Sequence, residues 1–129
     1  MSPTDRPILV VDDDADVREA VRDTLQDEGY PVAEASDGTE ALRYLRAHSP
    51  PPLILLDWNM APMNGGEFMA ELGKDARFSK AAVVLLTADA HIEDKVRSYA
   101  FADCLRKPVS LDKLFQLVAR FYHGQQDRP

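Results

Sequence analysis

The sequence predicts an α/β protein built on a doubly wound, five-stranded parallel sheet with helices on both faces. Short apolar runs alternate with longer amphipathic stretches five times along the 129 residues, which is the pattern of successive βαβ units. Three of the runs are wholly apolar and suit the buried middle of a sheet, whereas the second and fifth contain polar residues and suit its edges. The strand order 2-1-3-4-5 satisfies both conditions, and we expect that order.

The individual elements follow from this alternation. The expected strands are the runs 8–11, 31–35, 53–56, 83–86 and 104–106. Apolar residues recur at helical spacing after each run, and five helices are expected around 17–25, 41–45, 68–72, 91–100 and 111–118. Gly29 is expected to end the first helix, Ser36 or Asp37 to cap the second, and Ser110 to cap the fifth.

We expect a single domain. A chain of this length can bury one sizeable core, and no internal repeat or linker interrupts the alternation. The expected boundaries are an N-terminal extension at 1–6, the domain at 7–122 and a polar C-terminal tail at 123–129.

The composition narrows the classes of partner. The formal net charge is -7 and the pI is about 4.8, which argues against direct nucleic-acid binding, because that needs clustered Lys and Arg. Cys104 is the only cysteine, so no intrachain disulfide can form. No apolar run approaches membrane-spanning length, and the first residues lack the apolar core of a secretory signal. We therefore expect a cytoplasmic location without membrane contact.

Polar residues follow four of the expected strands at the point where each strand ends. Asp12 and Asp13 follow the first strand, Asp57 the third, Thr87 the fourth and Lys107 the fifth. In the flavodoxin-like strand order the first and third strands are neighbours, so the acids converge at the topological switch point. Open parallel sheets bind ligands at that edge, and we expect the functional site there.

The expected acidic cluster suits a divalent cation and phosphoryl transfer. Two carboxylates about 4 Å apart repel by about 4 kcal/mol at an effective dielectric of 20, so one must protonate or a cation must bind. Hard oxygen ligands favour Mg²⁺ or Mn²⁺, and the main-chain carbonyl of Asn59 is placed to add a ligand. Asp57 stands alone after its strand and is the candidate nucleophile, which leaves Asp13 as the likelier direct ligand and Asp12 as a ligand through water.

Each of these residues also has an ordinary explanation. An acid after an apolar strand usually forms a turn or caps a helix, which is the explanation that we prefer for Asp14 and Asp16. Thr87 alone would be a β-branched residue that ends a strand, and Lys107 alone would be a solvated charge. Their occurrence together at one edge of the sheet favours the functional interpretation.

At residues 7–122 the chain resembles the response-regulator receiver domain of the CheY type. The motifs that carry the resemblance are ILVVDDD at 8–14, LDWNM at 56–60, MNG at 63–65, Thr87-Ala88 and Lys107-Pro108. Each motif is weak alone, but together, in this order and spacing, they are specific. The fold that the resemblance implies is the one predicted above.

The resemblance also implies a function in two-component or phosphorelay signalling. Asp57 would accept a phosphoryl group from a phosphohistidine on a sensor histidine kinase or a histidine phosphotransferase. Mg²⁺ would be held by Asp13, Asp57 and the main chain of Asn59, with Asp12 in support. Thr87 and Lys107 would contact the phosphoryl oxygens, with no catalysis beyond the protein's own phosphorylation and dephosphorylation. The resemblance further implies a cis peptide at Lys107-Pro108 and a downstream protein partner that the sequence does not identify.

The chain departs from the family pattern around the fifth strand. The family's switch aromatic, three residues before the lysine, is Cys104 here, which we expect to be a small buried residue. Tyr99 or Phe101 are possible substitutes, although core packing is the more ordinary role for both. Trp58 is expected to be partly exposed near the mouth of the site. The receiver positions that flank the path of an attacking water are Asn59 and Asp89 here, which predicts a transient aspartyl phosphate.

Other functions stay open on the sequence alone. A phosphatase of the haloacid dehalogenase class also uses an aspartate after an apolar strand, and Asp12 with Asp14 imitates its Asp-x-Asp spacing. That pattern wants Thr or Val where this chain has Asp16, and the chain is short for its lid. A receiver-like module that works without phosphorylation is the second alternative, since Cys104 replaces the aromatic. Dinucleotide binding is disfavoured because no Gly-rich loop follows the first strand.

Overall fold

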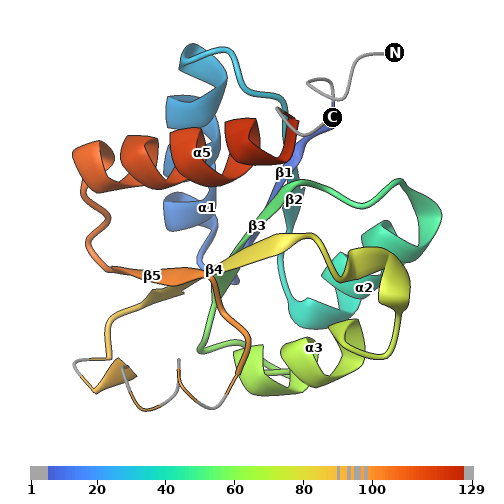
Figure 1. Cartoon of the computed structure of the whole chain (residues 1–129). Helices are drawn as coiled ribbons and strands as arrows, with labels where there is room; N and C mark the ends of the chain where they lie inside the picture. The colour runs from blue at the N-terminus through green and yellow to red at the C-terminus, as the bar shows by residue number, and fades with distance from the viewer. Residues whose placement is uncertain (1–5, 90, 93, 95–96, 98, 127–129) are drawn as a thin grey trace.

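The computed structural model describes residues 6–89, 91–92, 94, 97 and 99–126, and within them the predicted α/β architecture is confirmed (Figure 1). Five parallel strands form one sheet in the predicted order β2-β1-β3-β4-β5. The strands are β1 (Ile8–Val11), β2 (Val32–Ala35), β3 (Leu53–Asp57), β4 (Ala82–Thr87) and β5 (Asp103–Arg106). The helices that are described in full are α1 (Ala15–Asp27), α2 (Gly38–Ala47), α3 (Gly65–Leu72), the short 3-10 helix η2 (Ala76–Phe78) and α5 (Leu111–Gln126).

The helix predicted between β4 and β5 falls partly outside the described residues. Positions 90, 93, 95, 96 and 98 of the expected range or its edge are among those that are not described. Ile92 is described and is 1% exposed, so the apolar position predicted there does belong to the core.

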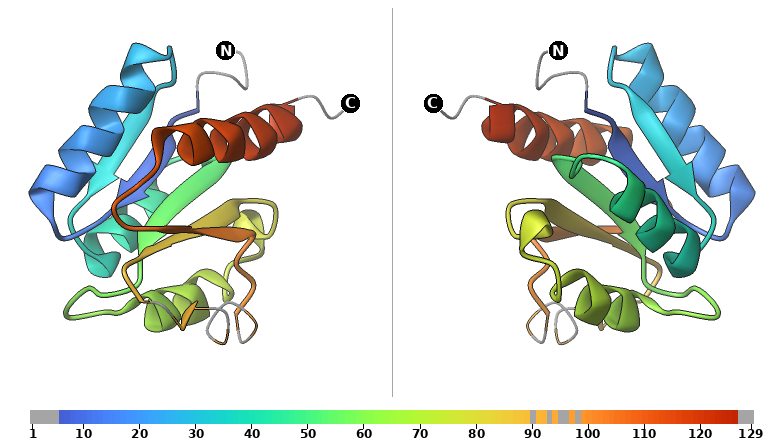
Figure 2. Two further views of the ribbon diagram at one scale, coloured as in Figure 1. Left: turned by 90° about the vertical axis from the view of Figure 1, so that its left-hand side faces the viewer. Right: turned by 90° about the vertical axis from the view of Figure 1, so that its right-hand side faces the viewer.

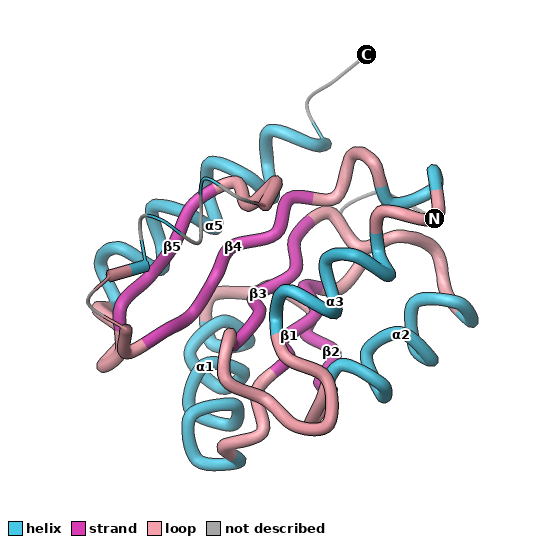
Figure 3. The backbone as a smooth tube through the Cα atoms, turned by 90° about the horizontal axis from the view of Figure 1, so that it is seen from below, coloured by secondary structure: helices cyan, strands magenta, loops and turns pink. Residues whose placement is uncertain are grey.

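The sheet separates two hydrophobic cores, because successive strand residues point to opposite faces. Ile8 and Val10 of β1 join the core under α1 and α5, whereas Leu9 and Val11 join the core under α2 and α3. Figure 3 shows the two helix pairs on opposite sides of the strands, and the side views of Figure 2 show α5 and α3 separated by the sheet. β1 and β3 are buried throughout and β4 is buried from Val83 onward, as their apolar sequences predict.

Local signals in the sequence set the helix ends. The Asp14 carboxylate caps α1 by accepting hydrogen bonds from the backbone of Asp16 and Val17, as expected of a turn-forming acid. Asp37, rather than Ser36, caps α2. Gly29 follows α1 with φ +90°, a left-handed conformation that favours glycine. The Ser110 hydroxyl accepts a hydrogen bond from the Lys113 backbone at 3.5 Å, as expected of a helix cap.

No helix in the described part of the chain combines the length and the apolar character that crossing a bilayer requires.

Candidate functional site

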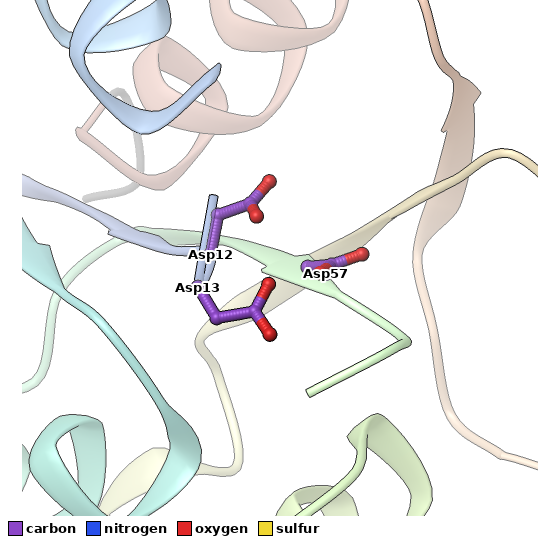
Figure 4. Close-up of side chains that lie close together, drawn as sticks. All are labelled: Asp12, Asp13 and Asp57. Carbon is purple, nitrogen blue, oxygen red and sulfur yellow. The ribbon is translucent and has the colours of Figure 1, made fainter. Parts of the chain in front are cut away.

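Three carboxylates meet at the carboxyl ends of β1 and β3, as the sequence predicts. The register pairs Val11 with Leu56, so Asp12 and Asp57 extend from neighbouring strands at the same level. One oxygen from each of Asp12, Asp13 and Asp57 lies within 4.8 Å of the others, and Figure 4 shows the side chains directed toward a common space. Asp12 is fully buried and Asp57 is 4% exposed, whereas Asp13 is exposed at the mouth of the crevice.

Lys107 brings a cation to the buried side of this cluster. Its Nζ lies 2.8 Å from Oδ2 of Asp12 and 3.4 Å from Oδ1 of Asp57. The backbone of Lys107 donates to the carbonyl of Thr87 at 2.8 Å, which fixes the end of β5 against β4. The Lys107-Pro108 peptide is cis, as predicted. A second cis peptide, Ala61-Pro62, lies in the loop after β3 and has no counterpart in the predictions.

The charges of this cluster perturb one another. Burial, followed by the nearby charge of Asp12, raises the pKa of Asp57 from 3.8 to about 6 against the opposing effect of Lys107. Burial acts to lower the pKa of Lys107, but its hydrogen bond and charge interaction with Asp12, together with Asp57, outweigh burial and raise that pKa. The site therefore holds its lysine charged and holds Asp57 as a carboxyl that ionises with difficulty while no further cation is present.

The backbone of Asp14 and the side chains of Arg18 and Lys107 hold Asp12 in place. Its Oδ1 accepts a hydrogen bond from the backbone of Asp14 at 2.9 Å, and its own carbonyl accepts one from Nη1 of Arg18 at 2.8 Å. Its Oδ2 faces Lys107. Asp12 was predicted as a metal ligand through water, and the geometry gives it the lysine as a direct partner. Asp13 is exposed, and one of its carboxylate oxygens lies within 4.8 Å of oxygens of Asp12 and Asp57.

Thr87 ends β4, and Asn59 lies two residues beyond the end of the neighbouring strand β3. Thr87 is fully buried at the end of β4, one residue beyond the residue that pairs with Asp57. Its Oγ1 accepts a hydrogen bond from the backbone of Asp89 at 3.0 Å, and a hydroxyl that accepts still keeps its hydrogen for donation. The backbone N–H of Asn59 donates a hydrogen bond to Oδ1 of Asp57 at 3.4 Å. Asp89 is half-buried, and its Oδ1 accepts a hydrogen bond from the backbone of His91.

The donor set fits a hard divalent cation. The exposed carboxylate of Asp13 and the buried carboxylate of Asp57 lie close together, and carboxylate oxygens suit Mg²⁺ and Mn²⁺ better than softer metals. Burial and the negative charge of Asp12 together oppose ionisation of Asp57 and raise its pKa, and a bound cation would favour the ionised form. Lys107 offsets only part of that charge, because it is shared between two carboxylates.

Three aromatic rings form a cluster beside the site that was not predicted from the sequence. Trp58 is half-buried as expected, and its ring packs against Tyr99 and Phe101, with ring centroids 5.5 and 6.2 Å away. Phe101 belongs to the core, but Tyr99 is 38% exposed, so the more ordinary expectation of core packing is wrong for Tyr99. Cys104 is half-buried against the core under α2 and α3 rather than fully buried.

Fold and site together define a receiver domain, in which acids at the ends of the first and third strands face a lysine at the end of the fifth. A model of the response regulator receiver domain family matches residues 8–119. The chain therefore belongs to the response regulator receiver domain family.

The chain is also similar to curated regulatory proteins. The response regulator Rre1 of Synechocystis is 37% identical over 92% of this chain and 52% of Rre1. The phosphate regulon transcriptional regulatory protein PhoB of Escherichia coli is 38% identical over 89% of this chain and 49% of PhoB. The chain thus spans about half the length of these relatives.

Solved receiver structures superpose on most of the chain. The response regulator TrrA of Thermotoga maritima, solved in complex with Mg²⁺-BeF, has a TM-score of 0.80 and 33% identity over 90% of this chain and 98% of its own. A response regulator receiver protein from Pseudomonas putida has a TM-score of 0.81 and 31% identity over 89% of this chain and 97% of its own.

Proposed function

We propose that this receiver domain accepts a phosphoryl group on Asp57 from a phosphohistidine, with Mg²⁺ or Mn²⁺, and thereby switches a protein-interaction surface. The observation that carries the proposal is the convergence of Asp12, Asp13 and Asp57 within 4.8 Å beside Lys107. Lys107 and the cation that the acids would hold would neutralise charge on a transferring phosphoryl group, and one carboxylate would act as nucleophile. The phosphodonor would be a sensor histidine kinase or a histidine phosphotransferase.

The transfer step is a displacement at phosphorus, in which the Asp57 carboxylate replaces the imidazole of the donor. An Oδ atom of Asp57 attacks the phosphorus, the phosphorus–nitrogen bond breaks, and its electron pair returns to the imidazole nitrogen of the donor. The products are an aspartyl phosphate and a histidine that takes up a proton from water. The raised pKa of Asp57 implies that the nucleophile is a carboxylate of strengthened basicity once it ionises.

The neighbouring residues have distinct parts in this proposal. Asp13, Asp57 and the main-chain carbonyl of Asn59 would hold the metal, whose chemistry is to neutralise phosphoryl oxygens and align them for in-line attack. Lys107 would turn from Asp57 to a phosphoryl oxygen, because a phosphate carries more charge than the carboxylate that it modifies. Thr87 would donate its hydroxyl hydrogen to another oxygen, and Asp12 would keep Lys107 charged and in place.

The phosphorylated state is proposed to be transient. Asn59 is exposed and Asp89 is half-buried, so polar groups flank the approach of water to the phosphorus. Attack by water breaks the bond between phosphorus and the Asp57 oxygen and returns the carboxylate, with inorganic phosphate as the second product. No reaction on a separate substrate is proposed, because the side chain of Asp14, the second acid of the phosphatase-like spacing, caps α1.

The wider assignments follow from the same proposal. The downstream partner is proposed to be a protein, with no direct contact to nucleic acid, since the chain has net charge -7. The domain boundaries 7–122, with 1–6 and 123–129 as flanking segments, stay predictions, as does the cytoplasmic location.

Acetyl phosphate tests the proposal without knowledge of the natural donor. The protein is incubated with acetyl phosphate and Mg²⁺, and the intact mass is measured. We expect the mass of one added phosphoryl group in the wild type, none in Asp57→Asn, and none when EDTA removes the metal. Glu19→Gln is the matched control, because it replaces an exposed carboxylate on α1 and should be modified like the wild type. Modification of Asp57→Asn to the wild-type extent would refute the proposal.

A further inference from the structure

A stack of three aromatic rings joins the acidic crevice to the segment that enters β5. Trp58, which lies between the proposed ligands Asp57 and Asn59, packs edge-to-face on Tyr99 with ring centroids 5.5 Å apart. Tyr99 also packs on Phe101 at 6.0 Å, and Phe101 is buried in the core. Immediately after Phe101, the backbone of Ala102 donates to the carbonyl of Val83 at the start of β4. Trp58 also contacts Phe101 at 6.2 Å, so each ring packs on the other two, and Tyr99 is the most exposed of the three.

The stack is seated on two glycines in the first turn of α3. A Cβ atom added at Gly66 would lie 2.6 Å from Oη and 2.9 Å from Cζ of Tyr99. A Cβ atom added at Gly65 would lie 3.0 Å from Cε3 of Trp58. Because both rings fill the space that a side chain would occupy, the packing leaves Tyr99 and Trp58 little freedom on this side.

The backbone of Trp58 is fixed at the same place. Its N–H donates to the carbonyl of Leu86 in β4 at 3.1 Å, and its carbonyl accepts from the backbone of Gly65 at 2.9 Å. Trp58 is the residue between Asp57 and Asn59 in the sequence, so its backbone links these two residues of the site. The ring and the backbone of Trp58 thus rest on the same residue, Gly65, at the point where the chain passes from Asp57 in β3 to Asn59.

We propose that Tyr99 is a positioning residue for the metal-binding loop, acting through Trp58. Its ring holds Trp58 against the first turn of α3 and so keeps the Asn59 main chain beside Asp57. Tyr99 touches no phosphoryl oxygen or metal ligand in this role. The inference rests on the proposed function, because it concerns the same metal site, and it gives an exposed tyrosine beside the crevice a role that packing alone does not require.

Space for a displaced ring exists beside the stack. A cavity of about 410 Å³ is lined by Tyr99 and by residues of α3, η2 and β4, among them Met69, Gly73 and Phe78. A tyrosine ring forced off Gly66 can enter this cavity without unfolding the core, so substitutions at Gly66 should change the position of the ring and leave the protein folded.

The test uses the fact that Trp58 is the only tryptophan in the chain. Emission and acrylamide quenching of the metal-free protein therefore report on Trp58 alone, and calorimetric titration gives the Mg²⁺ affinity independently. The variants that disturb the stack are Tyr99→Ala and Gly66→Ala, and the conservative variant is Tyr99→Phe. Gly73→Ala is the matched control, because its added Cβ meets nothing closer than a backbone oxygen at 3.5 Å.

We expect Tyr99→Ala and Gly66→Ala to shift Trp58 emission to the red, increase its quenching by acrylamide, and weaken Mg²⁺ binding by roughly two- to tenfold, the range implied by one aromatic pair. Tyr99→Phe and Gly73→Ala should resemble the wild type. In the Gly66→Ala/Tyr99→Phe double variant the loss should be smaller than in Gly66→Ala, since the atom at 2.6 Å is gone. Circular dichroism checks that every variant is folded.

The outcomes separate this inference from the proposed function. If the wild type binds Mg²⁺ and Tyr99→Ala binds it equally tightly, the positioning role is refuted while the proposed function stands. An equal loss in Gly73→Ala also refutes it, because general loosening of α3 would then explain the effect. If the wild type binds no Mg²⁺, both are refuted.

Discussion

Replacing Asp57 with asparagine should stabilise the metal-free protein at neutral pH, although it removes the proposed phosphoacceptor. Asp57 is 4% exposed, it lies beside the buried carboxylate of Asp12, and its pKa is raised from 3.8 to about 6. The folded state therefore opposes ionisation of this carboxyl, and the unfolded state does not. Asparagine has nearly the same shape and carries no charge that must be desolvated.

The sign and the pH range follow from the direction of the shift. Below about pH 4 the carboxyl is protonated in both states and contributes no difference. As pH rises from about 4 to about 6 the unfolded chain ionises first, so wild-type stability falls, and above about pH 6 the loss is complete. A rise of the carboxyl pKa from 3.8 to about 6 corresponds to a loss of about 3 kcal/mol in the free energy of unfolding. Water at the mouth screens the charge and Asp57→Asn weakens one contact of Lys107, so we expect a gain of about 1 to 2 kcal/mol.

The assay is urea unfolding in EDTA at pH 7.5 and at pH 4.5, with Asp57→Asn compared with the wild type and with Glu19→Gln. The gain should be present at pH 7.5 and should shrink at pH 4.5, while Glu19→Gln should differ little from the wild type at both. Adding Mg²⁺ should then raise wild-type stability more than that of Asp57→Asn, because a ligand that binds only the folded state stabilises it. A variant that is less stable than the wild type at pH 7.5, or a gain that does not depend on pH, would refute this electrostatic reasoning.

Three further substitutions test the site and its scaffold by urea unfolding at neutral pH. Lys107→Ala should cost about 2 to 3 kcal/mol, because it leaves the fully buried carboxylate of Asp12 without its cation, whereas Lys74→Ala, which breaks an exposed ion pair, should cost under about 0.5 kcal/mol. Equal costs for the two lysines would contradict the geometry. Gly29→Ala should cost about 1 to 2 kcal/mol, because φ is +90° there, and an unchanged midpoint would argue against that turn. Asp37→Ala should cost about 1 kcal/mol through loss of the α2 cap, and no cost would mean that the cap hydrogen bond is not formed.

The fold and the acidic cluster were predictable because they depend on local sequence and on topology. An apolar run without polar residues can only lie where both faces are covered, which places β1, β3 and β4 in the middle of the sheet. Once the order is known, residues that directly follow β1 and β3 must be neighbours. The cap at Asp37 and the stop at Gly29 rest on equally local chemistry.

The parts that the sequence could not give depend on long-range side-chain packing. Nothing near Tyr99 in the sequence indicates that its ring lies against Gly66 and Trp58, because that contact depends on the paths of two loops. The direct pairing of Asp12 with Lys107 has the same origin, since residue types alone do not decide which of two acids a lysine contacts. An available signal was the presence of two aromatic residues, at 99 and 101, close to the position where Cys104 replaces the family's aromatic.

Locating the phosphoryl group is the most direct test of the central claim. The protein is treated with acetyl phosphate and Mg²⁺, reduced at once with borohydride, digested, and its peptides are sequenced by mass spectrometry. Reduction converts an aspartyl phosphate to homoserine, and we predict homoserine at position 57 and at no other aspartate. Homoserine at position 12, or an unmodified aspartate at position 57 in protein that has gained a phosphoryl group, would contradict the account.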